Sequence, residues 1–163
     1  MLGNAAAKLI VAVIYILTAR RMGPDQFGLV ATAIGIGMAS AGFLDLGSNE
    51  YWIRELASRR ITQHNLNARM TTRMVLAVAG GATAVATAWL VAPMFVAMGF
   101  ILITTTVVQT SLVPLRATQR AESVGGVVVL GRVIALLAFW AQGTFGISPG
   151  VALWTSLVLG DAA

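Results

Sequence analysis

Long apolar stretches alternate with short polar ones along this chain of 163 residues. The long apolar stretches occupy 2–19, 28–47, 74–92, 99–115 and 124–145, and a shorter one occupies 149–163. About 20 apolar residues in a helix cross the roughly 30 Å hydrocarbon core of a bilayer. The pattern therefore predicts an all-α fold, a polytopic transmembrane helix bundle with about five complete spans. Because the last stretch is too short to cross, we expect a partial sixth span and a single transmembrane domain, 1–163, that is a fragment of a longer protein.

The break between the first two apolar stretches predicts a tight helical hairpin. Gly23 suits the left-handed residue that ends a helix, and Pro24 suits the first position of the next helix. Asp25 then places a negative charge where the dipole of the new helix favours it. Such a short connection predicts that the first two spans pack antiparallel.

Residues 74–115 carry no charge, which predicts a second hairpin. As one helix this segment would be about 63 Å long, roughly twice the hydrocarbon thickness. We place its turn between 92 and 99, where Pro93 and Gly99 interrupt the apolar run. The second half of the hairpin carries hydroxyl and amide side chains that either bond across helices or line a wet cavity. They are Thr104, Thr105, Thr106, Gln109, Thr110 and Ser111.

Small residues recur at four-residue spacing within two of the predicted spans. They are Ala31, Gly35 and Ala39 in the second span, and Gly80, Ala84 and Ala88 in the third. Small side chains at this spacing let the backbone of another helix approach closely. Both ridges are therefore predicted to be helix–helix contacts.

The polar segment 48–73 predicts a short amphipathic helix followed by a solvated loop. Ser48 or Asn49 suits the N-cap of that helix. Trp52 and Tyr51 suit the headgroup level of a membrane, so we expect the helix to lie along the membrane surface. Just before it, the carboxylate of Asp45 either is held at the interface by backbone amides or by Arg54, or binds a coupling cation.

Composition identifies lipid as the solvent of this chain. Hydrophobic residues make up 58% and charged residues 10%, against about 25% charged in ordinary soluble domains. The formal charge of +5 is explained by arginines kept in loops on one side of a membrane. Because no basic stripe is interleaved with aromatic residues, nucleic acid is not an expected partner. The chain has no cysteine, no Gly-rich phosphate loop and no His–acid cluster. We therefore expect neither an enzyme nor a cofactor or metal site.

Cations inside or beside the apolar stretches are the candidate site residues. Arg132 lies about 13 Å into its span, near mid-bilayer, where an arginine costs about 2.5–3.5 kcal/mol and needs compensation. We interpret Arg132 as an inward-facing anion site, and the alternative is an ion pair that only stabilises the bundle. Lys8 either anchors the first span at the interface or faces a pore. Arg20 and Arg21 lie at the outer mouth of the first hairpin.

The arginines of the predicted loops gather on one side of the membrane. The connections after the second and fourth spans carry Arg54, Arg59, Arg60, Arg69, Arg73, Arg116 and Arg120, whereas the first turn carries Arg20 and Arg21. Because cytoplasmic loops are enriched in Lys and Arg, this asymmetry predicts a cytoplasmic N-terminus and a cytoplasmic 48–73 segment.

Two motifs carry a family resemblance. Residues 21–28 read R-M-G-P-D-Q-F-G, and the second motif combines Asp45-Leu46-Gly47 with Ile53-Arg54-Glu55-Leu56-Ala57. The motifs and their spacing resemble the region around the first two spans of bacterial polysaccharide (O-antigen or exopolysaccharide) flippases. These transporters belong to the multidrug/oligosaccharidyl-lipid/polysaccharide exporter superfamily. The resemblance extends over the whole chain but covers only the N-terminal lobe of a two-lobe transporter.

The resemblance implies a multi-pass protein of the bacterial inner membrane that acts in polysaccharide biosynthesis. It would flip an undecaprenyl-diphosphate-linked oligosaccharide by alternating access, with a second lobe or the polysaccharide polymerase machinery as partners. A diphosphate head must meet cations in a low-dielectric core, and we hypothesise that Arg132, Lys8, Arg20 and Arg21 bind it. The alternatives are a drug or metabolite exporter of the same superfamily, or an inactive truncated or assembly subunit.

Overall fold

The described part of the chain is all helix, as the sequence predicts. The computed structural model describes residues 2–91, 95–117 and 121–162, and these contain helices and no strands. The helices are α1 (Leu2–Met22), α2 (Pro24–Asp45), α3 (Ser48–Ala57), α4 (Gln63–Val91), α5 (Val96–Ser111), α6 (Val113–Ala117), α7 (Ala121–Thr144) and α8 (Pro149–Ala162). The turn of the second hairpin falls between α4 and α5, and the predicted breaker Pro93 lies outside the described residues.

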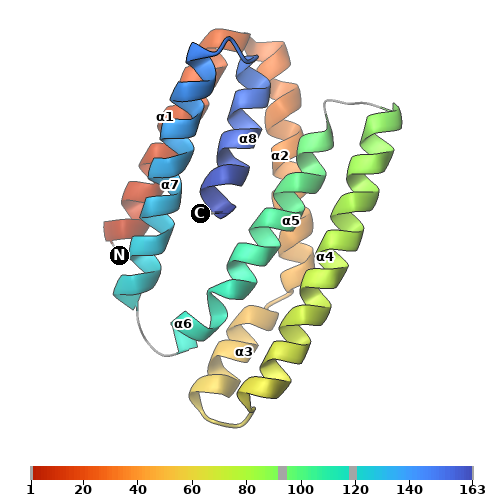
Figure 1. Ribbon diagram of the computed structural model, residues 1–163, viewed down its shortest axis with the longest axis vertical. Helices are drawn as coiled ribbons and strands as arrows, with labels where there is room; N and C mark the ends of the chain where they lie inside the picture. Colours follow the sequence, from red (N-terminus) through yellow and green to blue (C-terminus); the bar gives the residue numbers. More distant parts are fainter. Residues whose placement is uncertain (1, 92–94, 118–120, 163) are drawn as a thin grey trace.

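The long helices run roughly along the long axis of the molecule, and the short helices α3 and α6 lie at one end (Figure 1). α1, α7 and α8 form one group, α2, α4 and α5 form another, and α8 contacts both. The main core lies where they meet and contains Ile14, Ile34, Ile101, Ala135, Phe139, Ala152, Leu153 and Leu157. The short α8 is therefore the central packing element of the bundle.

Within the described residues, four helical stretches are long and apolar enough to cross a membrane. They are Pro24–Asp45, Gln63–Leu90, Val96–Ala117 and Val124–Thr144, and α1 and the 14-residue α8 lie outside this set. Large apolar side chains cover their outward faces, among them Phe43, Trp89, Leu90 and Trp140. An outer surface of this kind suits contact with hydrocarbon rather than water.

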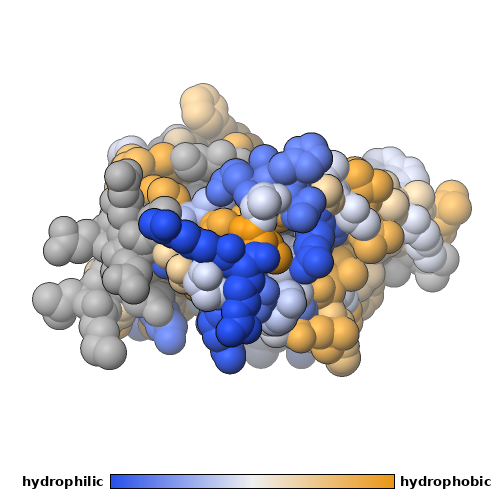
Figure 2. All heavy atoms as spheres, turned by 90° about the horizontal axis from the view of Figure 1, so that it is seen from below, coloured by the Kyte–Doolittle hydropathy of each residue, from blue (hydrophilic) through white to orange (hydrophobic). Residues whose placement is uncertain are grey.

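One end of the molecule is a polar structure that we call the basic cap. It consists of α3, the α3–α4 turn, the first three turns of α4, and α6, which together are residues 48–73 and 113–117. Figure 2 looks onto this end and shows hydrophilic side chains gathered at its centre. The predicted amphipathic helix is present as α3, but Trp52 is buried with Leu66 of α4 and Val113 of α6. The prediction that the Trp52 ring meets the headgroups is wrong, because that ring packs against protein, whereas Tyr51 beside it is exposed.

Of the two predicted ridges of small residues, the one on α4 is covered in part, because Ala88 is buried whereas Gly80 is exposed. The predicted ridge on α2 is wrong. Gly35 of α2 is exposed and has open space beside it, whereas a Cβ on Gly37 would lie 2.6 Å from the carbonyl oxygen of Met98. The contact ridge of α2 is therefore Ala33, Gly37 and Ala41, two residues out of register with the prediction. Gly99, predicted to interrupt a helix, instead lies inside α5 and touches Gly81 of α4.

The turn of the first hairpin forms as predicted, but its two helices, α1 and α2, separate with increasing distance from the turn. Pro24 begins α2, and Gly23 has a φ of 80°, a region that only glycine adopts freely. Near the turn the rings of Tyr15 and Phe27 meet edge to face at 6.0 Å. Farther along, α1 packs mainly on α7 and α2 mainly on α5. The hairpin thus joins the two helix groups instead of forming a closed pair.

Candidate functional site

Arg132 of α7 forms an ion pair with Asp161 of α8. The distance from Nη2 of Arg132 to Oδ1 of Asp161 is 2.7 Å, and the two side chains are 22% and 10% exposed. Both residues lie in apolar helices, so each would be costly to hold there alone. The ion pair offsets the cost of placing the charge of Arg132 in an apolar helix, as the sequence led us to expect.

Two glycines bring the charges together. Gly131 and Gly160 lie opposite each other where α7 crosses α8, and a Cβ on either one would collide with the carbonyl oxygen of the other. Each glycine directly precedes one member of the ion pair. A hydrogen bond of 2.7 Å from Thr155 of α8 to Gln142 of α7 adds a second polar tie nearer the α7–α8 turn. The register of the two helices is therefore fixed at two levels.

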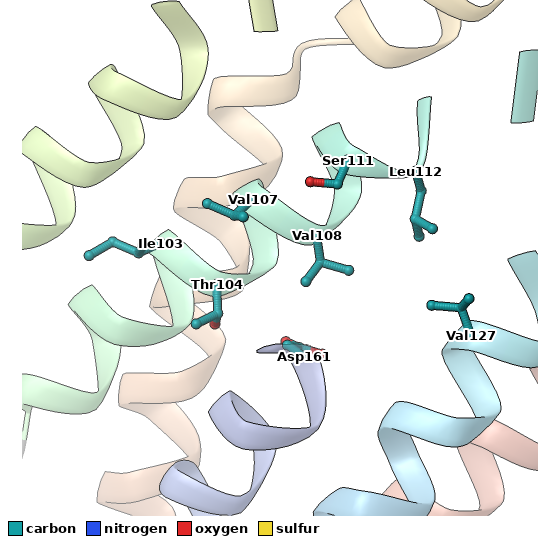
Figure 3. A pocket seen from close by; sticks show the side chains of 8 residues that line it. All are labelled: Ile103, Thr104, Val107, Val108, Ser111, Leu112, Val127 and Asp161. Atoms are coloured by element: carbon teal, nitrogen blue, oxygen red, sulfur yellow. The ribbon is translucent and has the colours of Figure 1, made fainter. Parts of the chain in front are cut away.

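A cavity of about 370 Å³ lies between α5, α7 and α8, next to the ion pair. Its lining consists of Ile103, Thr104, Val107, Val108, Ser111, Leu112, Val127 and Asp161. Figure 3 shows Asp161 at the end of α8 beside Thr104 of α5, with Val127 of α7 on the far side. An apolar hollow of this size with a few polar groups is typical of sites for small organic molecules or parts of larger ones.

The two members of the ion pair face this space differently. Asp161 lines the large cavity, whereas Arg132 lines an adjoining hollow of about 40 Å³ that Asp161 also borders. The guanidinium therefore lies behind the carboxylate as seen from the large cavity. While the pair is intact, an anion in the cavity meets a compensated arginine and a cation meets a compensated carboxylate.

The hydroxyl side chains of α5 divide between two environments. Thr104 and Ser111 line the cavity, as one of the two sequence interpretations expects. Thr104 donates to the carbonyl oxygen of Phe100 in its own helix. The hydroxyl oxygens of Thr105, Thr106 and Thr110 are buried without a hydrogen-bond partner among the described residues. Thr104 and Ser111 thus fit the cavity interpretation, whereas Thr105, Thr106 and Thr110 fit neither interpretation.

A second buried charge cluster lies where the basic cap joins the bundle. Arg73 of α4 is 5% exposed, and its Nη1 lies 3.0 Å from Oδ1 of Asp45 and 2.6 Å from Oδ1 of Asn49. Its guanidinium carbon also lies 5.7 Å from the centre of the Trp52 ring. Asp45 in turn accepts a hydrogen bond of 3.0 Å from the backbone N–H of Asn49. This cluster ties the end of α2 and the start of α3 to α4.

The cluster settles two sequence predictions about Asp45 and its neighbours. The prediction that Asp45 is held by a backbone amide is confirmed, but its arginine partner is Arg73 instead of Arg54, which is exposed. Neither Ser48 nor Asn49 is the N-cap, because the cap residue is Gly47 and makes no side-chain bond. Asp45, from the preceding helix, satisfies the N–H group that a capping side chain would have satisfied.

The structure does not gather the four cations predicted from sequence into one site. Only Arg132 lies beside a cavity at the α7–α8 crossing. Lys8 is exposed near the start of α1 and has no ion-pair partner among the described residues. Arg20 and Arg21 are exposed at the other end of α1, about 18 Å from Lys8 along the helix. Arg21 lies over the ring of Phe139 at 5.9 Å, so α7 holds its guanidinium in place.

Two residues of these sites were missed from the sequence. Asp161 is a lone acid in the apolar run 149–163, which was the signal that it could compensate Arg132. Arg73 was counted as a loop cation, although α4 extends three turns before the charge-free stretch and carries it inside the fold. Hollows of about 340 and 460 Å³ elsewhere have no charged residue in their linings.

The described residues contain no group of His, Cys, Asp and Glu side chains that could hold a metal ion. Comparisons of the chain with protein-family models, with curated proteins and with solved structures gave no match.

Proposed function

We propose that this chain is a lobe of a membrane exporter that moves a lipid-linked oligosaccharide from one leaflet to the other. The observation that carries the proposal is the Arg132–Asp161 pair beside a cavity of about 370 Å³. A buried pair is weak support for stability, since apolar residues would do as well or better. Its place at a cavity wall fits a role in meeting a charged ligand.

The proposed topology has five complete spans and a partial sixth. α1 is the first span, α2, α4, α5 and α7 follow, and α8 is the partial one. The basic cap lies in the cytoplasm, because it carries most of the loop arginines. We propose that this arrangement is one lobe of a polysaccharide flippase in the bacterial inner membrane, which acts with a second lobe or with polymerase machinery.

The ion pair suggests how an anionic head group is received. Arg132 binds the diphosphate when that group displaces the carboxylate of Asp161, so one charge-assisted contact is exchanged for another. Thr104 and Ser111 supply hydroxyl groups at the same wall. Exchange of partners avoids leaving Arg132 unpaired at any stage, and it requires no covalent chemistry. In this proposal Lys8, Arg20 and Arg21, which are exposed toward the two ends of α1, meet the head group as it enters and leaves.

Binding of a polyprenyl-diphosphate oligosaccharide to the purified chain tests the proposal. We expect saturable binding by the wild type, binding about tenfold weaker in Arg132→Gln, and unchanged binding in the matched control Arg60→Gln. Arg60 is exposed and lies 3.8 Å from Glu55, so the control removes the same charge away from the cavity. Wild-type binding no tighter than that of the uncharged polyprenol would contradict the proposal.

The second candidate is an exporter of amphiphilic cations, and the exposure of Asp161 to the larger cavity favours it. Asp161→Asn separates the two functions. If the ligand is an anion, the variant frees Arg132 and tightens binding of the diphosphate. If the ligand is a cation, the variant loses binding of a lipophilic cation such as tetraphenylphosphonium.

A further inference from the structure

Exposed arginines cover the outer side of the basic cap. Arg54 on α3, Arg59 in the α3–α4 turn, Arg69 on α4 and Arg116 on α6 are exposed and have no ion-pair partner among the described residues. By contrast, Arg73 is paired with Asp45, and Arg60 lies 3.8 Å from Glu55. The hydrophilic centre of this end in Figure 2 therefore carries charge that the fold does not neutralise.

The cap lies directly beside apolar surface of the kind that faces lipid. On α4, exposed apolar side chains begin at Val75 and Leu76, which are 60% and 57% exposed. Phe43 of α2 and the C-cap residue Leu46 are 73% and 83% exposed just before α3 begins. Arg69 precedes Val75 by six residues, a distance of about 9 Å along the helix. If Val75 sits in hydrocarbon, the guanidinium of Arg69 lies at the depth of the phosphate groups.

We propose that the basic cap binds the phosphate groups of anionic phospholipids in the leaflet beside it. We choose anionic phospholipids as the partner because their charge is opposite to that of the cap, and because a guanidinium binds phosphate oxygens with two parallel hydrogen bonds. A basic residue near a negatively charged membrane surface strengthens binding by about fivefold. The acids Glu50 and Glu55 offset part of the positive charge of α3, whereas residues 63–73 of α4 and the short α6 contain no acid. The proposal requires only that the chain spans a membrane, and it is independent of what the chain transports.

The test uses the full chain, purified in an uncharged detergent. Phosphatidylglycerol or phosphatidylcholine is titrated in, and the unfolding temperature is followed as a measure of lipid binding. We expect the wild type to be stabilised by phosphatidylglycerol only, and less so at high salt. The triple variant R54Q/R59Q/R69Q is expected to bind phosphatidylglycerol about a hundredfold more weakly. The control T144A changes an exposed residue at the far end of α7, outside both proposed binding sites, and is expected to bind as the wild type does.

Further control variants and ligands distinguish lipid binding from other causes of the same result. The variant R54K/R59K/R69K keeps the charge and is expected to retain most of the binding, which separates loss of charge from loss of folding. Inorganic phosphate at the same concentration is expected to have no effect, since the arginines of the cap bind several phosphate groups at once only when a lipid surface holds those groups together. Unchanged binding of phosphatidylglycerol by the triple variant would overturn the proposal. Equal stabilisation by soluble polyglutamate would also overturn it and would identify an acidic protein segment as the occupant.

Discussion

Arg132 and Asp161 meet one residue beyond the point where Gly131 and Gly160 bring the backbones of α7 and α8 into contact. The glycines allow the close crossing, and the crossing sets the distance between the charges. Charge and backbone contact therefore form one unit, in which a change to either glycine also disturbs the ion pair. This coupling is what a cavity wall needs if a ligand is to meet the pair in one fixed geometry.

The ion pair predicts a strongly non-additive pair of substitutions. Arg132→Gln and Asp161→Asn each leave one buried charge unpaired, and we expect each to lower the free energy of unfolding in detergent by about 2–3 kcal/mol. This is less than for a fully buried pair, because Arg132 is 22% exposed. The double variant removes both charges and is expected to recover more than half of the loss. Additive losses in the double-mutant cycle would show that the two charges do not interact.

The glycine contact predicts that α7 tolerates a methyl group at one glycine and not at another. Gly131→Ala places a Cβ against the backbone of Gly160, which cannot rotate away, so we expect a loss of about 1–3 kcal/mol. Gly125 lies in the same helix with open space around it. Gly125→Ala is therefore expected to be neutral or to stabilise by up to about 1 kcal/mol, since alanine is the better helix former. Unfolding of the two variants in the same detergent provides the measurement.

Much of the architecture could be predicted from the sequence because helix length and apolar content in a membrane are tied to bilayer thickness. Pro24 and Gly23 similarly marked one turn through their restricted and permissive backbones. Helix faces were harder to predict. Ala31, Gly35 and Ala39 satisfy the same spacing rule as Ala33, Gly37 and Ala41, and only the neighbouring helices decide which ridge is covered. In lipid both faces of a helix are apolar, so the pattern that reveals the inside of a soluble protein is absent.

The charged sites show the same limit. A lone arginine in an apolar run indicates that a partner exists, but the partner of Arg132 lies 29 positions away on another helix. For Asp45 the sequence offered Arg54, nine positions along, whereas the fold supplies Arg73 from α4. Distance along the chain is a poor guide to such pairs, because hairpins bring distant turns of different helices to the same depth.

The choice between Arg73 and Arg54 is itself testable. Arg73→Gln leaves Asp45 without its cation and removes a buried group from the Trp52 ring, so we expect a loss of about 2–4 kcal/mol in unfolding free energy. Arg54→Gln changes an exposed side chain and is expected to stay within about 0.5 kcal/mol of the wild type. The reverse order of effects would restore Arg54 as the partner.

The tryptophans report which surfaces face lipid. Trp89 and Trp140 are each 70% exposed on the apolar flank, and Trp52 is 8% exposed under α3. In variants that keep one tryptophan and replace the others by phenylalanine, phospholipids brominated on their acyl chains are expected to quench Trp89 and Trp140 strongly. Quenching of Trp52 is expected to be several times weaker. Strong quenching of Trp52 would instead show that its ring reaches the acyl chains and is not covered by α4 and α6.

The proposed orientation gives the last prediction, because the chain has no native cysteine and single cysteines can report each end. His64 lies exposed in the basic cap, and Thr144 lies exposed at the far end of α7. In intact cells we expect a membrane-impermeant maleimide to label Thr144→Cys and not His64→Cys, because loop arginines favour the cytoplasmic side. After the cells are broken, both positions are expected to react, which controls for buried or unfolded thiols. Labelling of His64→Cys alone from outside would show that the molecule has the opposite orientation, with the basic cap outside the cell. Labelling of both positions from outside would mean that α4 or α7 does not cross the membrane.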